Sequence, residues 1–261
     1  MAEDRYGVRD EEVEIERNRL EMLATARDPR TRRILNGTGL STGWRCWEVG
    51  AGAGSVSAWL GKRTGPDGAV WSTDVDLQFH CPTLPNVVVE QHDVANDPVP
   101  ESAFDLVHAR AVLQHLPERD QVIEKLWKAL VPGGWLVAED GAFGSFAQQS
   151  LPEPYATVHR YVSSGVTTQW RDADYGVQLV GRFRDLGALD VDVVGDVWAM
   201  RPQEPEGEWW FMALERAIPR LVEAGLVTPT EGETALAQVR EPGFVMMSTV
   251  SIAVVGRKPA K

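Results

Sequence analysis

The sequence has little cysteine, and the two that it contains offer neither a disulfide framework nor a cluster of metal ligands. It lacks any apolar run near the roughly 18 residues that a membrane-spanning helix needs. Basic residues are also scarce: 26 Lys and Arg stand against 38 Asp and Glu, and the net charge of −12 would repel a nucleic-acid backbone. We therefore expect no metal, no membrane partner and no nucleic-acid partner, and favour a small-molecule ligand.

The N-terminal stretch MAEDRYGVRDEEVEIER is acidic and lacks the apolar region of an export signal, which favours a cytoplasmic protein. No Ser/Gly/Pro-rich linker or block of like charge divides the chain, and 43% of its residues are hydrophobic, enough for one core. We expect a single domain over 1–261. Its parts would be N-terminal helices at 1–40, a core at 41–140 and substrate-side segments at 141–261.

Strand and helix patterns alternate from residue 44 onward. Apolar runs predict strands at 44–49, 69–74, 86–91, 104–109, 134–139, 190–198 and 244–255. Helical spacing predicts helices at 55–63, 118–130, 173–186 and 208–224. Such alternation, with near-continuous apolar strands, is typical of a doubly wound α/β fold in which helices cover both faces of a parallel sheet.

Two helices are expected before the first strand. Glu11 to Ala26 carries apolar residues at helical spacing among charges, which predicts an amphipathic surface helix. Asp28-Pro29 then has the form of a cap followed by a first-turn proline, which predicts a second, short helix through Leu35. Insertions at 141–170 and 199–243 fall outside the repeating unit, where α/β proteins commonly place substrate walls.

Three glycines alternate in the stretch EVGAGAG, residues 48–54, directly after the first predicted strand. In a doubly wound sheet such a turn opens onto a helix and lets a ligand approach the backbone. A dinucleotide-binding fingerprint would read GxGxxG, whereas here Ser55 takes the sixth place, which disfavours a pyrophosphate. Glu48 argues the same way, since like charges would meet in a partly desolvated crevice, and its carboxylate would suit an ammonium group.

Two aspartates follow the next two strands. Asp74 ends the second strand, where a carboxylate can accept hydrogen bonds from both hydroxyls of a ribose. Asp93 follows the third strand and suits the exocyclic amine of adenine. Each has a structural alternative, because Asp74 could cap the next helix and Asp93 could be a turn residue. An ammonium, a ribose and an adenine with no phosphate between them describe S-adenosylmethionine (SAM).

The segments EVGAGAG, AFDLVHARAVLQHLPERD and LVPGGWLVAED, together with Asp74 and Asp93, resemble the class I SAM-dependent methyltransferases. The resemblance is strongest to small-molecule methyltransferases of actinobacterial type, and it covers roughly residues 40–140. It implies SAM as cofactor and a Rossmann-like, mostly parallel seven-stranded sheet whose last strand is antiparallel. The N-terminal helices and the helical insertions would form a lid.

The resemblance also implies a role for each matching residue. Glu48 and the glycine turn would hold the methionine moiety, Asp74 the ribose, and Asp93 with Val94 the adenine. Tyr6 and Arg19 resemble lid residues, although Arg19 could equally be an ordinary solvated or salt-bridged arginine. The expected cofactor-binding set is Tyr6, Arg19, Glu48, Gly50, Ala51, Gly52, Gly54, Ser55, Asp74, Val75, Asp93, Val94, Ala109 and Arg110.

Methyl transfer from a sulfonium needs mainly alignment, but a base helps where the acceptor must lose a proton. The candidate catalytic residues are His115, His159 and Asp140. His115 could instead order its loop, His159 could lie at the surface, and Asp140 could cap a turn. We expect His108 to be a core residue whose hydrogen bonds are satisfied. The late aromatics could wall an acceptor pocket or pack in the core: Trp170, Trp198, Trp209, Trp210 and Phe211.

The sequence therefore predicts an enzyme that transfers a methyl group from SAM to an O, N or C atom of a small aromatic or polycyclic natural product. One alternative is a SAM-binding protein that transfers no methyl group and acts as a regulator or as the catalyst of another reaction. Another is a nicotinamide-dependent oxidoreductase, against which the GxGxG spacing argues. The expected partner is a small-molecule methyl acceptor, and the sequence leaves a homodimer open.

Overall fold

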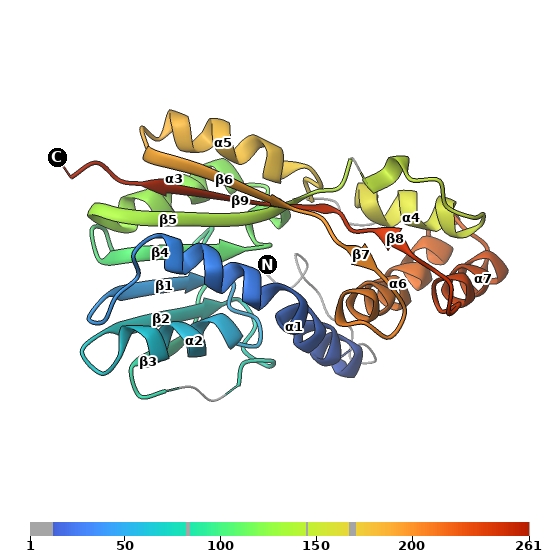
Figure 1. Ribbon diagram of the computed structural model, residues 1–261, viewed down its shortest axis with the longest axis horizontal. Coiled ribbons are helices and arrows are strands. Elements are labelled where there is room, and N and C mark those ends of the chain that lie inside the picture. Colours follow the sequence, from blue (N-terminus) through green and yellow to red (C-terminus); the bar gives the residue numbers. More distant parts are fainter. Residues whose placement is uncertain (1–12, 82–83, 145, 167–170, 261) are drawn as a thin grey trace.

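The computed structural model describes residues 13–81, 84–144, 146–166 and 171–260. A seven-stranded sheet has the order β3-β2-β1-β4-β5-β9-β6 (Figure 1). Its strands are β1 Arg45–Val49, β2 Ala69–Asp74, β3 Val87–Gln91, β4 Phe104–Arg110, β5 Leu130–Ala142, β6 Leu189–Asp196 and β9 Val250–Arg257. Neighbours are parallel from β3 to β5, whereas β9 is antiparallel to both β5 and β6. The predicted Rossmann-like sheet with an antiparallel last strand is confirmed.

Helices cover both faces of this sheet. Helices α1 (Val13–Gly37) and α2 (Ser55–Thr64) pack over Cys46, Leu106 and Val137 on one face. Helices α3 (Arg119–Ala129) and α5 (Tyr175–Asp185) pack over Trp47, Val107 and other apolar residues on the opposite face. Successive strand residues point to opposite faces, so burial on both sides explains why the strands read as near-continuous apolar runs.

The N-terminal region departs from the prediction. A single helix, α1, runs from Val13 to Gly37 with Pro29 inside it, where two helices were expected. Asp28 is not a helix cap: its carboxylate is buried and accepts hydrogen bonds from Arg110 and Arg32, at 3.0 Å each. The predicted amphipathic segment packs one face against the late helix α6, while Glu14, Arg17 and Glu21 on the other face are exposed. These contacts with the rest of the fold outweigh the cost of a proline within the helix.

The two predicted insertions build a separate helical layer. Helices α4 (Tyr155–Ser164), α6 (Pro205–Glu223) and α7 (Pro229–Val239) gather beyond the carboxyl ends of the parallel strands (Figure 1). Two short strands, β7 (Ala199–Met200) and β8 (Met246–Met247), pair beside them. The predicted strand at 244–255 is therefore divided into β8 and β9. We call this layer, with its own aromatic core, the helical insertion.

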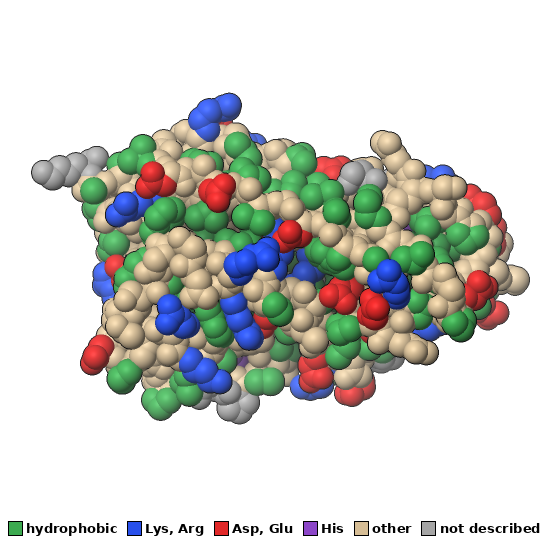
Figure 2. All heavy atoms as spheres, in the orientation of Figure 1, with side chains coloured by type: hydrophobic (Ala, Val, Ile, Leu, Met, Phe, Trp, Pro, Cys, Tyr) green, Lys and Arg blue, Asp and Glu red, His purple; other side chains and the backbone are tan. Residues whose placement is uncertain are grey.

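No helix within the described ranges is long and apolar enough to cross a membrane. Figure 2 shows one face of the molecule, on which Lys and Arg side chains lie among acidic and apolar ones. The visible surface therefore mixes both signs of charge, although the chain as a whole is acidic.

Candidate functional site

The glycine turn links β1 to α2 at the carboxyl edge of the sheet. Gly50, Gly52 and Gly54 have φ values of 65°, 54° and 80°, a left-handed conformation that side-chain-bearing residues rarely adopt. Packing accounts for two of them, since a Cβ would lie 2.3 Å from Val112 at Gly50 and 2.6 Å from His80 at Gly54. At Gly52 the nearest described atom is a leucine methyl carbon of α1, 3.6 Å away. Close approach of a ligand remains the prediction for Gly52.

Asp74 lies beside this turn at the end of β2. Its Oδ2 accepts a hydrogen bond of 2.8 Å from the amide of Gly52, and its Oδ1 accepts one of 3.2 Å from the amide of Asp76. Burial raises the pKa of Asp74, and these amide hydrogen bonds act in the opposite direction. A carboxylate held against an open glycine backbone fits the ribose end of SAM.

Asp93 makes the hydrogen bonds expected of a turn residue, which is the structural alternative to binding adenine. Its Oδ1 accepts from the amide of Ala95 at 3.0 Å, and its Oδ2 accepts from the side chain of Asn96 at 2.7 Å. Val94 is buried in the core beneath α3. The turn role is therefore present in the structure, and recognition of adenine by Asp93 and Val94 remains a prediction.

Three further residues of the predicted cofactor-binding set lie in or beside the glycine turn. Ala51 donates its amide to the carbonyl of Thr73 at 2.9 Å, which ties the turn to β2. Ser55 begins α2 directly after the turn. Val75 follows β2 and is 36% exposed, so its side chain is accessible from the carboxyl edge of the sheet. Contact of these three residues with the cofactor remains a prediction.

Glu48 is buried within the sheet region and faces His108. His108 Nδ1 lies 2.6 Å from Glu48 Oε2, and its Nε2 lies 3.1 Å from Glu139 Oε1. Burial by itself lowers the pKa of His108, but the two carboxylates raise it to about 9. The imidazole is therefore protonated at neutral pH and donates both hydrogen bonds, as expected of a satisfied core residue. A methionine ammonium group would have to share Glu48 with this histidine.

Two arginines connect α1 to this part of the sheet. Arg30 Nη1 donates to Glu139 Oε2 at 2.7 Å, and Arg30 Nε pairs with Asp196 of β6. Arg110, at the end of β4, donates to Asp28 Oδ1 and to Thr31, each at 3.0 Å. Charged contacts thus fix α1 across the carboxyl edge of the sheet. Next to Arg110, Ala109 is buried at the end of β4, and its contact with the cofactor remains a prediction.

Arg19, on the first part of α1, makes a two-pronged salt bridge with Glu16. Its Nε and Nη2 donate to the two carboxylate oxygens at 2.8 and 2.6 Å. Glu16 is fully buried and also accepts from Arg216 of α6 at 2.6 Å. The salt-bridged alternative for Arg19 is therefore present, while its contact with SAM remains a prediction. Tyr6 lies outside the described residues.

Two of the predicted catalytic residues, His115 and Asp140, meet around Gln114. His115 Nε2 is 3.0 Å from the side-chain amide nitrogen of Gln114. Burial, and then nearby arginines led by Arg171, lower the pKa of His115 to about 3. Asp140, buried within β5, accepts a hydrogen bond from the backbone of Gln114, and burial raises its pKa well above the usual value. Its Oδ1 has no hydrogen-bond partner in the described structure.

His159 does not join this pair. It is almost fully buried in the helical insertion, so the expected surface placement is wrong. Its ring centre lies 4.2 Å from that of Phe146 and 5.7 Å from those of Tyr155 and Trp210. Burial lowers the pKa of His159 to about 4. Tyr155 lies one helical turn earlier on α4.

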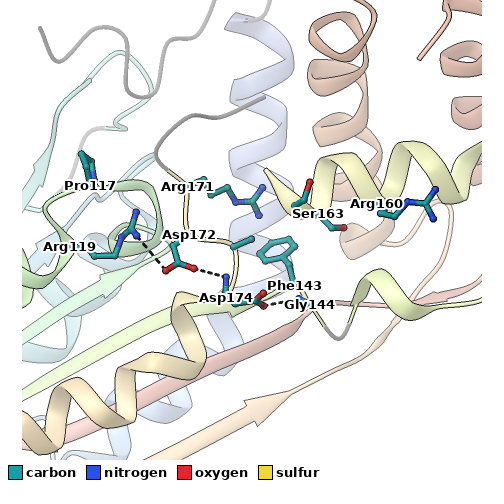
Figure 3. A pocket seen from close by; sticks show the side chains of 11 residues that line it. Pro117, Arg119, Phe143, Gly144, Arg160, Ser163, Arg171, Asp172 and Asp174 are labelled. Carbon is teal, nitrogen blue, oxygen red and sulfur yellow. Dashed lines mark hydrogen bonds and ion pairs between the residues drawn. The ribbon is translucent and has the colours of Figure 1, made fainter. Parts of the chain in front are cut away.

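A pocket of about 700 Å³ opens beyond the end of β5, where Phe143 and Gly144 line it (Figure 3). Arg119 and Arg171 line it and also lower the pKa of His115, and the amide of Asp172, another lining residue, donates to the carbonyl of Gln114 at 2.8 Å. The pocket therefore lies close to Gln114, although neither His115 nor Asp140 is among its lining residues. Its volume is in the range of small-molecule sites. The lining residues are Pro117, Arg119, Phe143, Gly144, Arg160, Ser163, Ser164, Arg171, Asp172, Ala173 and Asp174.

The pocket differs from the one expected, since none of the described late aromatics lines it. Trp210 is buried in the core of the helical insertion, and Trp198, Trp209 and Phe211 pack against that core. Trp170 lies outside the described residues. Sequence reasoning missed the pocket's arginines and Ser163. The motif LPERD and the run WRDAD contain two of these arginines, but nothing in either run shows that they converge.

The described residues contain no group of three or more His, Cys, Asp or Glu side chains arranged to hold a metal ion. Glu48, His108 and Glu139 instead bond to one another. Both cysteines are free, Cys46 buried and Cys81 exposed. The expectation that the protein uses no metal therefore remains a prediction.

A family model described as a methyltransferase domain matches residues 47–136, from β1 into β5. The methyltransferase GfsG of Streptomyces halstedii is 29% identical over 241 residues, covering 88% of this chain and 82% of that protein. The methyltransferase str3 of Strobilurus tenacellus is 34% identical over 145 residues, 54% of this chain. The chain spans about half of str3, 52% of its length.

Among solved structures, phosphoethanolamine N-methyltransferase 2 of Haemonchus contortus, in complex with SAM, has a similar fold. The TM-score is 0.54 at 15% identity, over 88% of this chain and 52% of that one. The strand order, the motifs from EVGAGAG to LVPGGWLVAED and the two sequence relatives agree with this likeness. SAM is the cofactor of the family to which these findings point. The matching methyltransferase-domain model, these relatives and the shared fold together support a class I SAM-dependent methyltransferase.

Proposed function

We propose that this chain transfers the methyl group of SAM to an oxygen, nitrogen or carbon atom of a small aromatic or polycyclic natural product. The observation that carries the proposal is the placement of two features along one edge of the sheet. Gly52 and Asp74 form a cofactor cradle at the ends of β1 and β2, and the pocket of about 700 Å³ lies at the end of β5. The pocket's size supports a small-molecule acceptor.

Bound SAM supplies a methyl group on a sulfonium, which is electrophilic without further activation. The chain then has to hold the two reactants in line, which can supply roughly 7–11 kcal/mol of the barrier in well-positioned systems. In this proposal Asp74 and the backbone of Gly52 hold the cofactor. Helix α1 crosses the turn and is held there by the Arg30 and Arg110 contacts.

Asp140 is the better candidate for a base, should the acceptor lose a proton. A pKa of about 3 leaves the imidazole of His115 neutral at pH 7 but makes it a weak proton acceptor. The raised pKa of Asp140 makes its carboxylate a stronger base, and its Oδ1 has no hydrogen-bond partner within the described chain. Gln114 contacts both groups, so His115 would position the acceptor while Asp140 takes the proton. Burial lowers the pKa of His159 to about 4, so its imidazole is a weak proton acceptor, which argues against a role for it as the base.

The cofactor half of this proposal is tested with Asp74→Ala. Loss of a charged acceptor of ribose hydroxyls should weaken the binding of SAM and of S-adenosylhomocysteine by roughly 1–3 kcal/mol, measured by calorimetry. Asp67→Ala, in the exposed turn between α2 and β2, is the matched control and should bind normally. Equal affinities in the two variants would rule out the ribose assignment.

Single-turnover labelling distinguishes the proposed function from the alternative, a SAM-binding protein that transfers no methyl group. Protein loaded with methyl-labelled SAM is mixed with a panel of phenols, amines and carbon nucleophiles. The proposed function predicts label on at least one acceptor and loss of that transfer in Asp140→Asn for acceptors that must lose a proton. Label that stays on the cofactor across the whole panel favours the alternative.

The proposal also includes a cytoplasmic location and a small-molecule acceptor as the partner, with no nucleic acid or membrane involved. The net charge of −12 and the mixed charges of the visible surface support it. A homodimer remains open, and light scattering coupled to gel filtration measures it directly. Fractionation of producing cells tests the location, and membrane-bound protein would contradict it.

A further inference from the structure

The pocket is rich in guanidinium groups, although the chain carries a net charge of −12. Arg119, Arg160 and Arg171 come from three separate segments and line the same cavity. Positive charge is therefore concentrated at the site proposed for the acceptor.

The two acidic residues of the lining are engaged by the protein itself. Asp174 Oδ1 accepts from the amide of Gly144 at 2.7 Å. Asp172 Oδ2 accepts from Gln178 at 2.8 Å and from Arg119 at 3.4 Å, and its Oδ1 accepts from the amide of Asp174 at 3.1 Å (Figure 3). These bonds order the segment that leads into α5, so the carboxylates serve to shape the wall.

Arg171 is placed to bind a ligand through its planar group. Its guanidinium lies over the ring of Phe143, 4.2 Å from the ring centre, and Nη1 donates to the carbonyl of Val162 at 3.3 Å (Figure 3). A guanidinium stacked on an aromatic ring keeps its charge and a fixed orientation. The N–H groups at its edge have the geometry that carboxylates and phosphates accept in pairs.

Ser163 gives an independent indication of a ligand. It lines the pocket on α4 and is only 1% exposed, yet its hydroxyl has no hydrogen-bond partner in the described structure. Buried hydroxyls are nearly always hydrogen-bonded, because leaving one unsatisfied costs roughly 1–3 kcal/mol. An acceptor atom from a bound molecule would satisfy it.

We propose that the methyl acceptor is an acid whose carboxylate or phosphate group binds in this pocket, held by Arg171 and Arg119 and accepting a hydrogen bond from Ser163. This inference rests on the proposed function and names the charge of its substrate. A neutral analogue would displace water from these groups without replacing its hydrogen bonds. The pocket should therefore discriminate against neutral molecules of the same shape.

The test uses benzoate, phenyl phosphate and benzamide as probes, with the chain 1–261 saturated with S-adenosylhomocysteine. Ligand-observed NMR gives the dissociation constant of each probe. We expect at least one anion to bind roughly tenfold or more tightly than benzamide, as a charge-assisted bond implies. The stronger of the two anions identifies a carboxylate or a phosphate acceptor. Equal affinity for all three probes would overturn the proposal.

Matched variants locate the effect. Arg171→Gln and Arg119→Gln should each abolish the preference for the anion, and Ser163→Ala should reduce it by a smaller factor. Arg184→Gln, which removes an exposed arginine of α5, should retain the preference. Circular dichroism checks folding, and Arg119→Gln decides the matter should Arg171→Gln not fold. A preference that survives the loss of either pocket arginine contradicts the proposal.

Binding of S-adenosylhomocysteine, measured on the same samples, separates the two levels of inference. Normal cofactor binding with no preference for the anion would overturn the acidic acceptor alone. Failure of the wild-type protein to bind S-adenosylhomocysteine would overturn the proposed function itself.

Discussion

Two buried histidines show how differently the two regions of this molecule are held together. In the sheet region His108 lies between Glu48 and Glu139, and its pKa rises to about 9. In the helical insertion His159 lies among aromatic rings, and its pKa falls to about 4. The sheet region joins α1 to its strands through paired charges, whereas the insertion joins its helices through apolar packing.

The difference bears on what each region contributes. A buried network of charges tolerates little change, because removing one member leaves another charge buried without its partner. An aromatic core loses stability in proportion to the groups removed. The sheet region, which would bind the cofactor, should therefore lose more stability on substitution than the helical insertion. Substitutions of similar size should lower the free energy of unfolding by unequal amounts in the two regions.

The largest effect is expected from Glu139→Gln in the sheet region. The substitution preserves size but removes the charge that faces His108 and Arg30, and should lower the free energy of unfolding by about 3–5 kcal/mol. Urea unfolding followed by circular dichroism measures it. Glu124→Gln, at an exposed position of α3, should be nearly neutral. Similar losses in both variants would remove the basis of the comparison.

A smaller loss is expected from Tyr155→Phe in the helical insertion. The Tyr155 hydroxyl accepts from Trp210 Nε1 at 2.7 Å and lies 2.9 Å from the sulfur of Met246. Its removal leaves the indole N–H unsatisfied, which costs roughly 1–3 kcal/mol in the free energy of unfolding. Affinity for S-adenosylhomocysteine should not change. Weaker cofactor binding in this variant would show that the two regions do not act separately.

Gly52→Val should weaken cofactor binding and have a smaller effect on stability, the opposite of Tyr155→Phe. A side chain in the left-handed conformation of Gly52 costs roughly 1–2 kcal/mol of stability, and it would project where the cofactor is expected. Calorimetry should detect weaker binding of S-adenosylhomocysteine in protein that remains folded. Val177→Ala, at an exposed position of α5, serves as the control. Normal binding in folded Gly52→Val would exclude close approach of the cofactor to this backbone.

The smallest effects are expected in the titration of the two histidines. NMR signals of the two imidazole rings, recorded as a function of pH, measure their pKa values. The folded pKa of His108 exceeds the ordinary value of about 6.5, so its contribution to stability is complete below that pH and lost as pH rises through about 9. The pKa of His159 is lowered, so its contribution is present above about 6.5 and lost as pH falls through about 4. Titration of both rings near 6.5 would contradict the distinction between the regions.

The sheet and its helices were predictable because burial on both faces leaves a continuous signal in the strands. The continuity of α1 was not, because Asp28-Pro29 has the form of a helix start. Only contacts with distant residues such as Arg110 show that the helix continues. Helix α7 was missed although Thr228 and Glu231 form a capping box that the sequence displays.

The candidate site was predictable where its residues follow one another along the chain. The glycine turn and Asp74 come from a motif with regular spacing, and the structure brings them into contact. The pocket arginines come from separate segments, and an arginine in a charged run looks like a solvated residue. Likewise, the burial of His159 depends on packing between α4 and the late helices, which no local pattern in α4 reveals.

The place where the helical insertion leaves the sheet has a consequence for how such enzymes diverge. Residues 197–250 depart after Asp196 on β6 and return at Ser251 on β9, and these two residues are paired neighbours in the sheet. A loop whose ends lie one strand spacing apart, about 4.8 Å, can change length at little entropic cost. Related chains can therefore vary this segment, whose helices α6 and α7 pack against the pocket-lining helix α4, while the strands of the cofactor half stay unaltered.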